Sequence, residues 1–123
     1  MRPLSAAAAA ALFVALPGAG QRDAVPAATT AGEPVDCVPL RNIRETRVRD
    51  DRTIDFVMRN GKVYRNDLGI ACPRLGFERR FLFKTTIGSV CAVDTITVLE
   101  TSNLSPGPTC GLGKFQPVTL AKR

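Results

Sequence analysis

The chain is 123 residues long, carries 17 lysine and arginine residues against 11 carboxylates, and contains four cysteines and no histidine. This length suits a single domain with a modest core, and the lack of histidine removes the commonest general base and a frequent zinc ligand. The composition therefore disfavours histidine-dependent catalysis, while the net charge of +6 favours anionic partners.

The N-terminus has the organisation of an export signal. A positively charged start precedes the apolar run Ala6–Leu16, which is too short to cross a bilayer of about 30 Å as a helix. Small residues then permit signal cleavage after Gly20, after Ala27 or after Ala28. The sequence leaves the choice between these positions open.

Three segments follow from this organisation. We expect residues 1–28 to hold the signal peptide and the start of a tether, and residues 29–36 to form a flexible linker. Residues 37–120 should fold as a single domain. No later stretch reaches about 18 consecutive apolar residues. We therefore expect a periplasmic or secreted protein with no transmembrane segment after signal cleavage.

The middle of the chain predicts a β-hairpin. Apolar and polar residues alternate over residues 53–58, and Asn60-Gly61 is a strong signal for a two-residue hairpin turn before a strand over residues 62–66. That turn pairs Met58 with Val63 and puts both on the core face with the apolar residues of the first strand, Ile54 and Phe56. The same register sets Arg65 opposite Phe56, where the pairing must fray or bulge.

The remaining elements complete an all-β prediction. Strands are expected at 43–48, 77–83, 94–100 and 114–120, with Pro117 keeping the last strand at an edge. No stretch shows a helical period over ten residues, so helix should be scarce. The fold class is therefore a small disulfide-stapled barrel or sandwich of about five or six short strands, after an N-terminal signal peptide helix.

The four cysteines of an exported chain predict two disulfides. We favour Cys37 with Cys110, which would join the first strand to the last, and Cys72 with Cys91, which would close a loop around the 77–83 strand. The chain has no Cys-x-x-Cys pair, so a zinc site or a redox-active pair is disfavoured. We expect no metal and no cofactor.

Short motifs surround these cysteines. They include Cys37-Val-Pro-Leu, the Asp50-Asp51 turn, Gly61-Lys-Val-Tyr64, Cys91-Ala-Val-Asp94 and Cys110-Gly-Leu-Gly. As a set they resemble a family of small exported bacterial proteins, a four-cysteine domain of unknown function. The resemblance covers about residues 37–118. It implies export and a stapled fold, and it implies no catalytic residue.

The acidic residues do not predict a catalytic site. Asp94-Thr95 is followed by isoleucine instead of the glycine of aspartic proteases, and a lone aspartate cannot form a two-carboxylate site. Nothing fixes any two acidic residues at the separation that glycoside hydrolysis requires; the candidates are Glu45, Asp50, Asp51, Asp55, Glu78 and Asp94. We therefore expect a protein that is not an enzyme, and the alternative is a small secreted hydrolase that uses carboxylates only.

The basic residues supply the candidate binding surface. Arg79, Arg80 and Lys84 form one cluster, and Arg44 and Arg47 lie in a second arginine-rich segment. Such surfaces suit an anionic envelope component or simply keep the protein soluble. Nucleic acid is disfavoured because few aromatic residues are free for base stacking. The sequence thus predicts an exported envelope protein, structural or ligand-binding, with a basic surface for an anionic partner.

Overall fold

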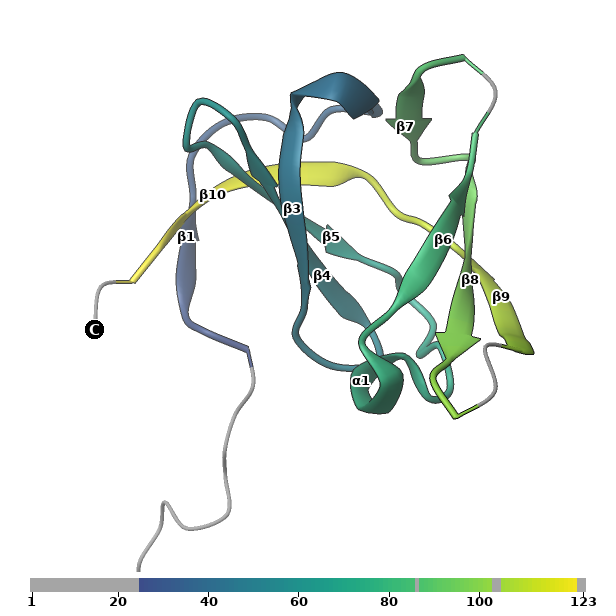
Figure 1. Ribbon diagram of the computed structural model, residues 1–123. Coiled ribbons are helices and arrows are strands. Elements are labelled where there is room, and N and C mark those ends of the chain that lie inside the picture. The colour runs from purple at the N-terminus through teal and green to yellow at the C-terminus, as the bar shows by residue number, and fades with distance from the viewer. Residues whose placement is uncertain (1–24, 86, 103–104, 122–123) are drawn as a thin grey trace, which may run out of the picture.

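The computed structural model describes residues 25–85, 87–102 and 105–121. The predicted signal helix and the Gly20 cleavage position lie outside these residues. In the described part, ten strands form three antiparallel sheets (Figure 1), which confirms the all-β prediction. The elements are β1 (Ala28–Thr30), β2 (Cys37–Pro39), the 3-10 helix η1 (Leu40–Asn42), β3 (Ile43–Val48), β4 (Thr53–Met58), β5 (Val63–Asp67), α1 (Leu75–Glu78), β6 (Phe81–Lys84), β7 (Ser89–Cys91), β8 (Thr95–Glu100), β9 (Ser105–Gly111) and β10 (Phe115–Leu120).

The core lies between the two larger sheets. One sheet has the strand order β1-β10-β5-β4-β3, and the other has the order β6-β8-β9 (Figure 1). Phe56 of β4 is fully buried, and its ring centroid lies 6.1 Å from that of Phe83 on β6 and 5.1 Å from that of Phe115 on β10. The small sheet β2-β7 adds Val38 and Val90 to the same core. Aromatic packing on Phe56 therefore joins the two larger sheets.

The β4–β5 hairpin forms where it was predicted, with a different loop. Val57, and not Met58, pairs with Val63. The Met58 N–H donates to the Lys62 carbonyl, and the Gly61 N–H donates to the Met58 carbonyl. Gly61 has a φ of 91°, as the last residue of a three-residue hairpin loop requires. The predicted two-residue turn is therefore wrong by one residue.

This slip of one residue changes which side chains share a face. Val63 leaves the face of Phe56, and Arg65 moves opposite Asp55. The predicted core face is confirmed, because Ile54 and Phe56 are fully buried. Asp55, on the other face of β4, is also fully buried. Strand β4 is thus enclosed on both faces, and Arg65 lies outside the apolar core.

The segment predicted as a flexible linker is partly ordered into the sheet. In β1, Ala28 pairs with Leu120 of β10, and further along Val35 forms a bridge with Phe115. The prediction of a flexible linker over residues 29–36 is therefore wrong where the chain pairs with β10. The folded domain begins before Cys37.

Strand β10 is not an edge strand, contrary to the expectation from Pro117, because it lies between β1 and β5. The Pro117 carbonyl accepts from the Ala31 N–H, just beyond the end of β1. The N–H that proline lacks would point to the same side. The missing N–H of Pro117 therefore faces the chain beyond the end of β1. Strand β10 loses no hydrogen bond to β1 by having a proline at this interior position.

The predicted strand over residues 77–83 begins only at Phe81. Its first part belongs to α1, and Phe77 is 77% exposed. The helical turn is selected by tertiary contacts, since the Asp51 carboxylate accepts from the Gly76 N–H at 2.7 Å. Strand β9, which contains two prolines, was not predicted. It pairs only with β8 and is therefore an edge strand, where proline is tolerated.

The disulfide pairing differs from the prediction. Cys37 bonds to Cys91 and Cys72 bonds to Cys110. Strand β2 pairs with β7 and not with a C-terminal strand, so Cys37 and Cys91 lie directly opposite each other with a Cα–Cα distance of 4.0 Å. The contact with the last strand that was assigned to Cys37 is made instead by Val35. One disulfide therefore joins the two strands of the β2-β7 sheet, and the other joins the segment between β5 and α1 to β9.

Peptide mapping of the oxidised protein with a glutamate-specific protease, which cuts at Glu45, Glu78 and Glu100 and so separates the four cysteines, should recover a Cys37–Cys91 peptide and a Cys72–Cys110 peptide without reduction. Both should separate into single-cysteine peptides in a reduced control sample. A peptide that links Cys37 to Cys110 would contradict the β2–β7 pairing itself, because that pairing is what brings Cys37 to Cys91.

Candidate functional site

The basic residues predicted as an anion-binding surface do not gather at one place. Arg44 and Arg47 lie on β3, and both contact Glu45, at 3.7 Å and 2.6 Å. Arg79 ends α1 and donates to the Gly76 carbonyl, whereas Lys84 lies at the opposite end of β6 from α1 (Figure 1). Arg44 and Arg47 therefore share the Glu45 carboxylate, while Arg79 and Lys84 are exposed cations on either side of the β6 strand residues between them.

One predicted residue does join other cations. Arg79 lines a shallow depression with Arg49 and Arg52, and the same depression contains Asp50 and Asp51. The Asp50 carboxylate accepts a hydrogen bond from the Arg52 N–H at 2.9 Å, and the Asp51 carboxylate accepts one from the Gly76 N–H in α1. Charges of both signs alternate there, so the depression offers no basic patch.

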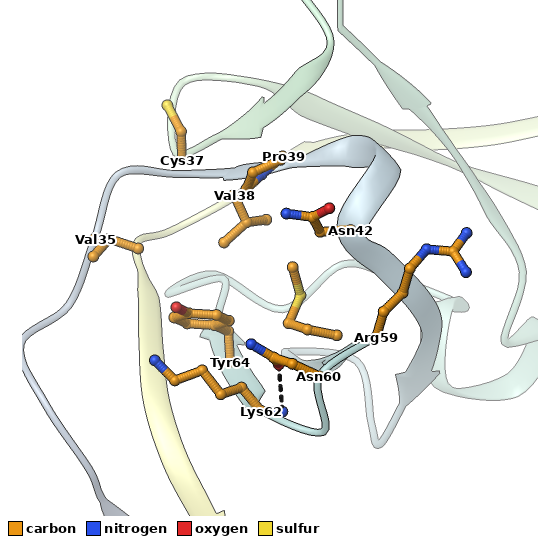
Figure 2. Close-up of a pocket in the computed structure, with 10 residues that line it drawn as sticks. Val35, Cys37, Val38, Pro39, Asn42, Arg59, Asn60, Lys62 and Tyr64 are labelled. Carbon is orange, nitrogen blue, oxygen red and sulfur yellow. Dashed lines mark hydrogen bonds between the residues drawn. The ribbon is translucent and has the colours of Figure 1, made fainter.

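A different concave site lies beside the β4–β5 hairpin loop (Figure 2). This site, which we name the hairpin pocket, has a volume of about 400 Å³. It is bounded by the β2 segment, by η1 and by the hairpin loop. Its lining residues are Val35, Cys37, Val38, Pro39, Asn42, Met58, Arg59, Asn60, Lys62 and Tyr64.

The inner wall of the hairpin pocket is apolar. Val38 and Met58 are buried, and the half-buried Tyr64 ring stands beside them. The Tyr64 ring also carries a cation, because the Lys62 ammonium nitrogen lies 5.9 Å from its centroid. The pocket thus combines an apolar surface and an aromatic face with a positive charge at its edge.

The rim of the hairpin pocket carries amide groups. The Asn60 side-chain oxygen accepts from the Lys62 N–H at 2.9 Å, so the Asn60 amide nitrogen points its donors elsewhere. Asn42, the last residue of η1, presents a second amide on the other side of the pocket (Figure 2). The hydrogen bond to Lys62 fixes the direction of the Asn60 amide, and both amides can donate and accept hydrogen bonds.

The formal charge of the lining is positive. Arg59 and Lys62 are its charged members, and no carboxylate lines the pocket among the described residues. The Arg59 Nε donates to the Arg41 carbonyl at 2.8 Å, which fixes the guanidinium against η1. An anionic or acceptor-rich group is therefore favoured here over a cationic one.

Asp55 is the most enclosed carboxylate, and it is held by two arginines. Arg65 binds it through two nitrogens, at 2.8 Å and 2.9 Å, and the Arg49 Nε binds it at 2.8 Å. Burial raises the pKa of Asp55, but the hydrogen bonds from Arg65 and Arg49 outweigh burial and hold the pKa below its ordinary value. The pair with Asp55 also raises the pKa of Arg65. Asp55 is therefore an ionised structural group and not a proton donor.

Other acidic residues hold local structure. The Asp94 carboxylate accepts from the Cys91 N–H at 2.7 Å and so closes the turn before β8. Glu78 accepts from the Thr101 N–H at 3.0 Å and from Arg74 at 2.6 Å. The Thr101 N–H and Arg74 keep the pKa of Glu78 below its ordinary value. Both carboxylates therefore form hydrogen bonds that stabilise the local fold.

Within the described residues, no group of three or more histidine, cysteine, aspartate or glutamate side chains is placed to hold a metal ion. The same residues contain no helix that is long and apolar enough to span a membrane. Two disulfides and no free cysteine are consistent with an oxidising compartment.

The hairpin pocket was not predicted from the sequence. Its lining comes from segments that are separated along the chain. Strand β2 and helix η1 have three residues each, too few for a hydrophobic pattern that would predict their structure. The one available signal was Lys62 and Tyr64 beside the Asn60-Gly61 turn.

Comparison with protein-family models, with curated proteins and with solved structures finds no match. The resemblance to a four-cysteine family of exported proteins therefore stays a prediction.

Proposed function

We propose that this protein is an exported, non-enzymatic binding module of the cell envelope that holds an anionic envelope component in the hairpin pocket. The observation that carries the proposal is the lining of that pocket, whose described residues include two cations, two amides and an aromatic face and no carboxylate. The leader pattern supports export, and the two disulfides are consistent with it. The proposal keeps the predicted anionic partner and moves its binding site from Arg79, Arg80 and Lys84 to the hairpin loop.

The chemistry of the pocket suggests the form of the ligand. A ring or other apolar unit fits against Val38, Met58 and Tyr64, while a negative group on the same unit lies near Lys62. A phosphorylated or carboxylated sugar of an envelope polymer has both features. The alternative of a carboxylate-only hydrolase has less support, because the acidic residues described above hold turns, a helix or buried arginines.

The Lys62→Ser variant should weaken binding of lipopolysaccharide and of its detached phosphorylated core saccharide. Loss of one exposed ionic contact of about 1 kcal/mol corresponds to about fivefold in Kd. Binding of the unmodified protein should also fall as salt is added, because exposed charges are screened over about 8 Å at physiological ionic strength. Titration of the oxidised protein with each probe measures both effects.

The matched control is Lys84→Ser, which removes the same charge from a site outside the pocket. It should leave Kd nearly unchanged. Equal weakening by both substitutions would show that net charge alone attracts the ligand. Absence of binding to either probe would refute an envelope saccharide as the ligand of the pocket.

A further inference from the structure

The N-terminal segment just before Cys37 is bonded to the sheet along its length. The Pro26 carbonyl accepts from the Arg65 Nη1 at 3.1 Å, and the Ala27 carbonyl accepts from the Ala121 N–H at 2.9 Å. Further along, the Ala31 N–H donates to Pro117, and the Gly32 carbonyl accepts from the Gln116 side chain. The contacts begin at Pro26, upstream of β1.

We infer that the signal peptide is cut N-terminal to Val25, after Gly20, and that cleavage after Ala27 or Ala28 does not occur in the folded product. The inference rests on the leader predicted from the sequence and is independent of the hairpin pocket. Its basis is that the latter two positions lie inside a segment that the folded sheet uses.

The first reason is the buried charge cluster. Arg65 and Arg49 share the single carboxylate of Asp55, and Arg65 directs its remaining contact to the Pro26 carbonyl. Cleavage after Ala27 or Ala28 removes that acceptor from a guanidinium whose side chain is only 16% exposed. It also creates a positive α-ammonium group at Ala28 or Thr29, two or three positions beyond Pro26, near a cluster in which two arginines share one carboxylate.

The second reason is the edge of the five-stranded sheet. Strand β1 covers β10, and its register runs from Ala28 with Leu120 to Thr30 with Val118. Cleavage after Ala28 would remove the first of these pairs and the Ala27 contact before it. The backbone of β10 would then present unpaired groups at an exposed edge, which promotes pairing with other chains.

Cleavage after Gly20 avoids both costs. Gly18 and Gly20 are small residues at the spacing that signal cleavage needs. This position leaves Pro26 and the whole of β1 in the mature chain. The mature protein therefore begins at Gln21.

The test uses the full chain with its own leader, exported into the periplasm of a Gram-negative host and recovered in oxidised form. Intact mass should correspond to a chain that begins at Gln21. A mature chain that begins at Ala28 or Thr29 would overturn the inference, and so would recovery of the uncut chain alone.

Two variants of the full chain locate the cut independently. Gly20→Leu puts a large residue at the inferred position and should cause the uncut chain to accumulate. The control Ala27→Leu changes an exposed residue at the rejected position and should be processed like the unmodified chain. If Gly20→Leu were cut after Ala27 or Ala28 and its product kept the same urea midpoint, the Pro26 and Ala27 contacts would be dispensable and the inference would be wrong.

Discussion

Replacing Asp55 by asparagine is expected to lower the free energy of unfolding by about 3–5 kcal/mol, because removing one member of a buried ion pair leaves the other charge uncompensated. Here two guanidinium groups, those of Arg49 and Arg65, would lose their common carboxylate. The substitution keeps the size of the side chain. The decrease in the free energy of unfolding is therefore due to lost charge and hydrogen bonding and not to a cavity. Urea denaturation with the disulfides intact measures it.

The matched control is Glu45→Gln, which removes a carboxylate from an exposed pair with Arg47. Exposed pairs contribute about 0–1 kcal/mol, so the midpoint should change little. Similar effects of the two substitutions would mean that Asp55 is not uniquely important. That outcome would also weaken the argument that Pro26 belongs to the mature domain.

The cluster of Asp55, Arg49 and Arg65 should also make the stability of the protein depend on pH in the acidic range. In the folded protein the pKa of Asp55 lies below its ordinary value, whereas in the unfolded chain it should be near 3.9. A depressed pKa contributes stability that is complete above the unfolded value and is lost as the pH falls through the folded value. The unmodified protein should therefore lose stability below about pH 4 more steeply than Asp55→Asn. Urea midpoints measured from neutral to acidic pH compare the two, and parallel curves would contradict the assignment.

The hairpin shows how far local sequence signals reach. Asn60-Gly61 correctly predicted the position of the turn, and alternation correctly predicted that Ile54 and Phe56 face the core. The loop length could not be read from the dipeptide, since glycine with positive φ suits both two-residue and three-residue loops. The deciding contact joins Asp55 and Arg65, which are 10 residues apart in the sequence. Only the three-residue loop sets these opposite charges side by side.

The disulfides and the pocket depend on contacts that no local pattern encodes. Residues Cys37–Pro39 are too few to show an alternation, so their pairing with β7 could not be predicted, and the cysteine pairing followed from that choice. The same short strand forms one wall of the hairpin pocket. Charge counting found the arginine-rich segments, but it could not show that Arg47 is paired with Glu45. Local sequence thus predicted the fold class better than the site.

Replacing Phe56 by alanine is expected to destabilise the protein by about 3–5 kcal/mol, the range for removing a buried aromatic ring. Its ring is fully buried and lies between Phe83 of β6 and Phe115 of β10, with an edge-on contact to Phe115. The substitution therefore removes both area and ring contacts at the junction of the two larger sheets. Urea denaturation of the oxidised variant measures the loss.

Phe77→Ala provides the control for this effect, because it deletes the same ring from the surface. Phe77 is 77% exposed, and the Arg74 guanidinium carbon lies 5.4 Å from its ring centroid. An exposed cation–π contact contributes about 0.5–1 kcal/mol, so this variant should unfold close to the unmodified protein. If Phe77→Ala lowered the free energy of unfolding as much as Phe56→Ala, the contribution of a phenylalanine to stability would not depend on its burial. The junction between the sheets would then not depend on Phe56, and the division of β4 into an apolar face and a charged face would lose its main support.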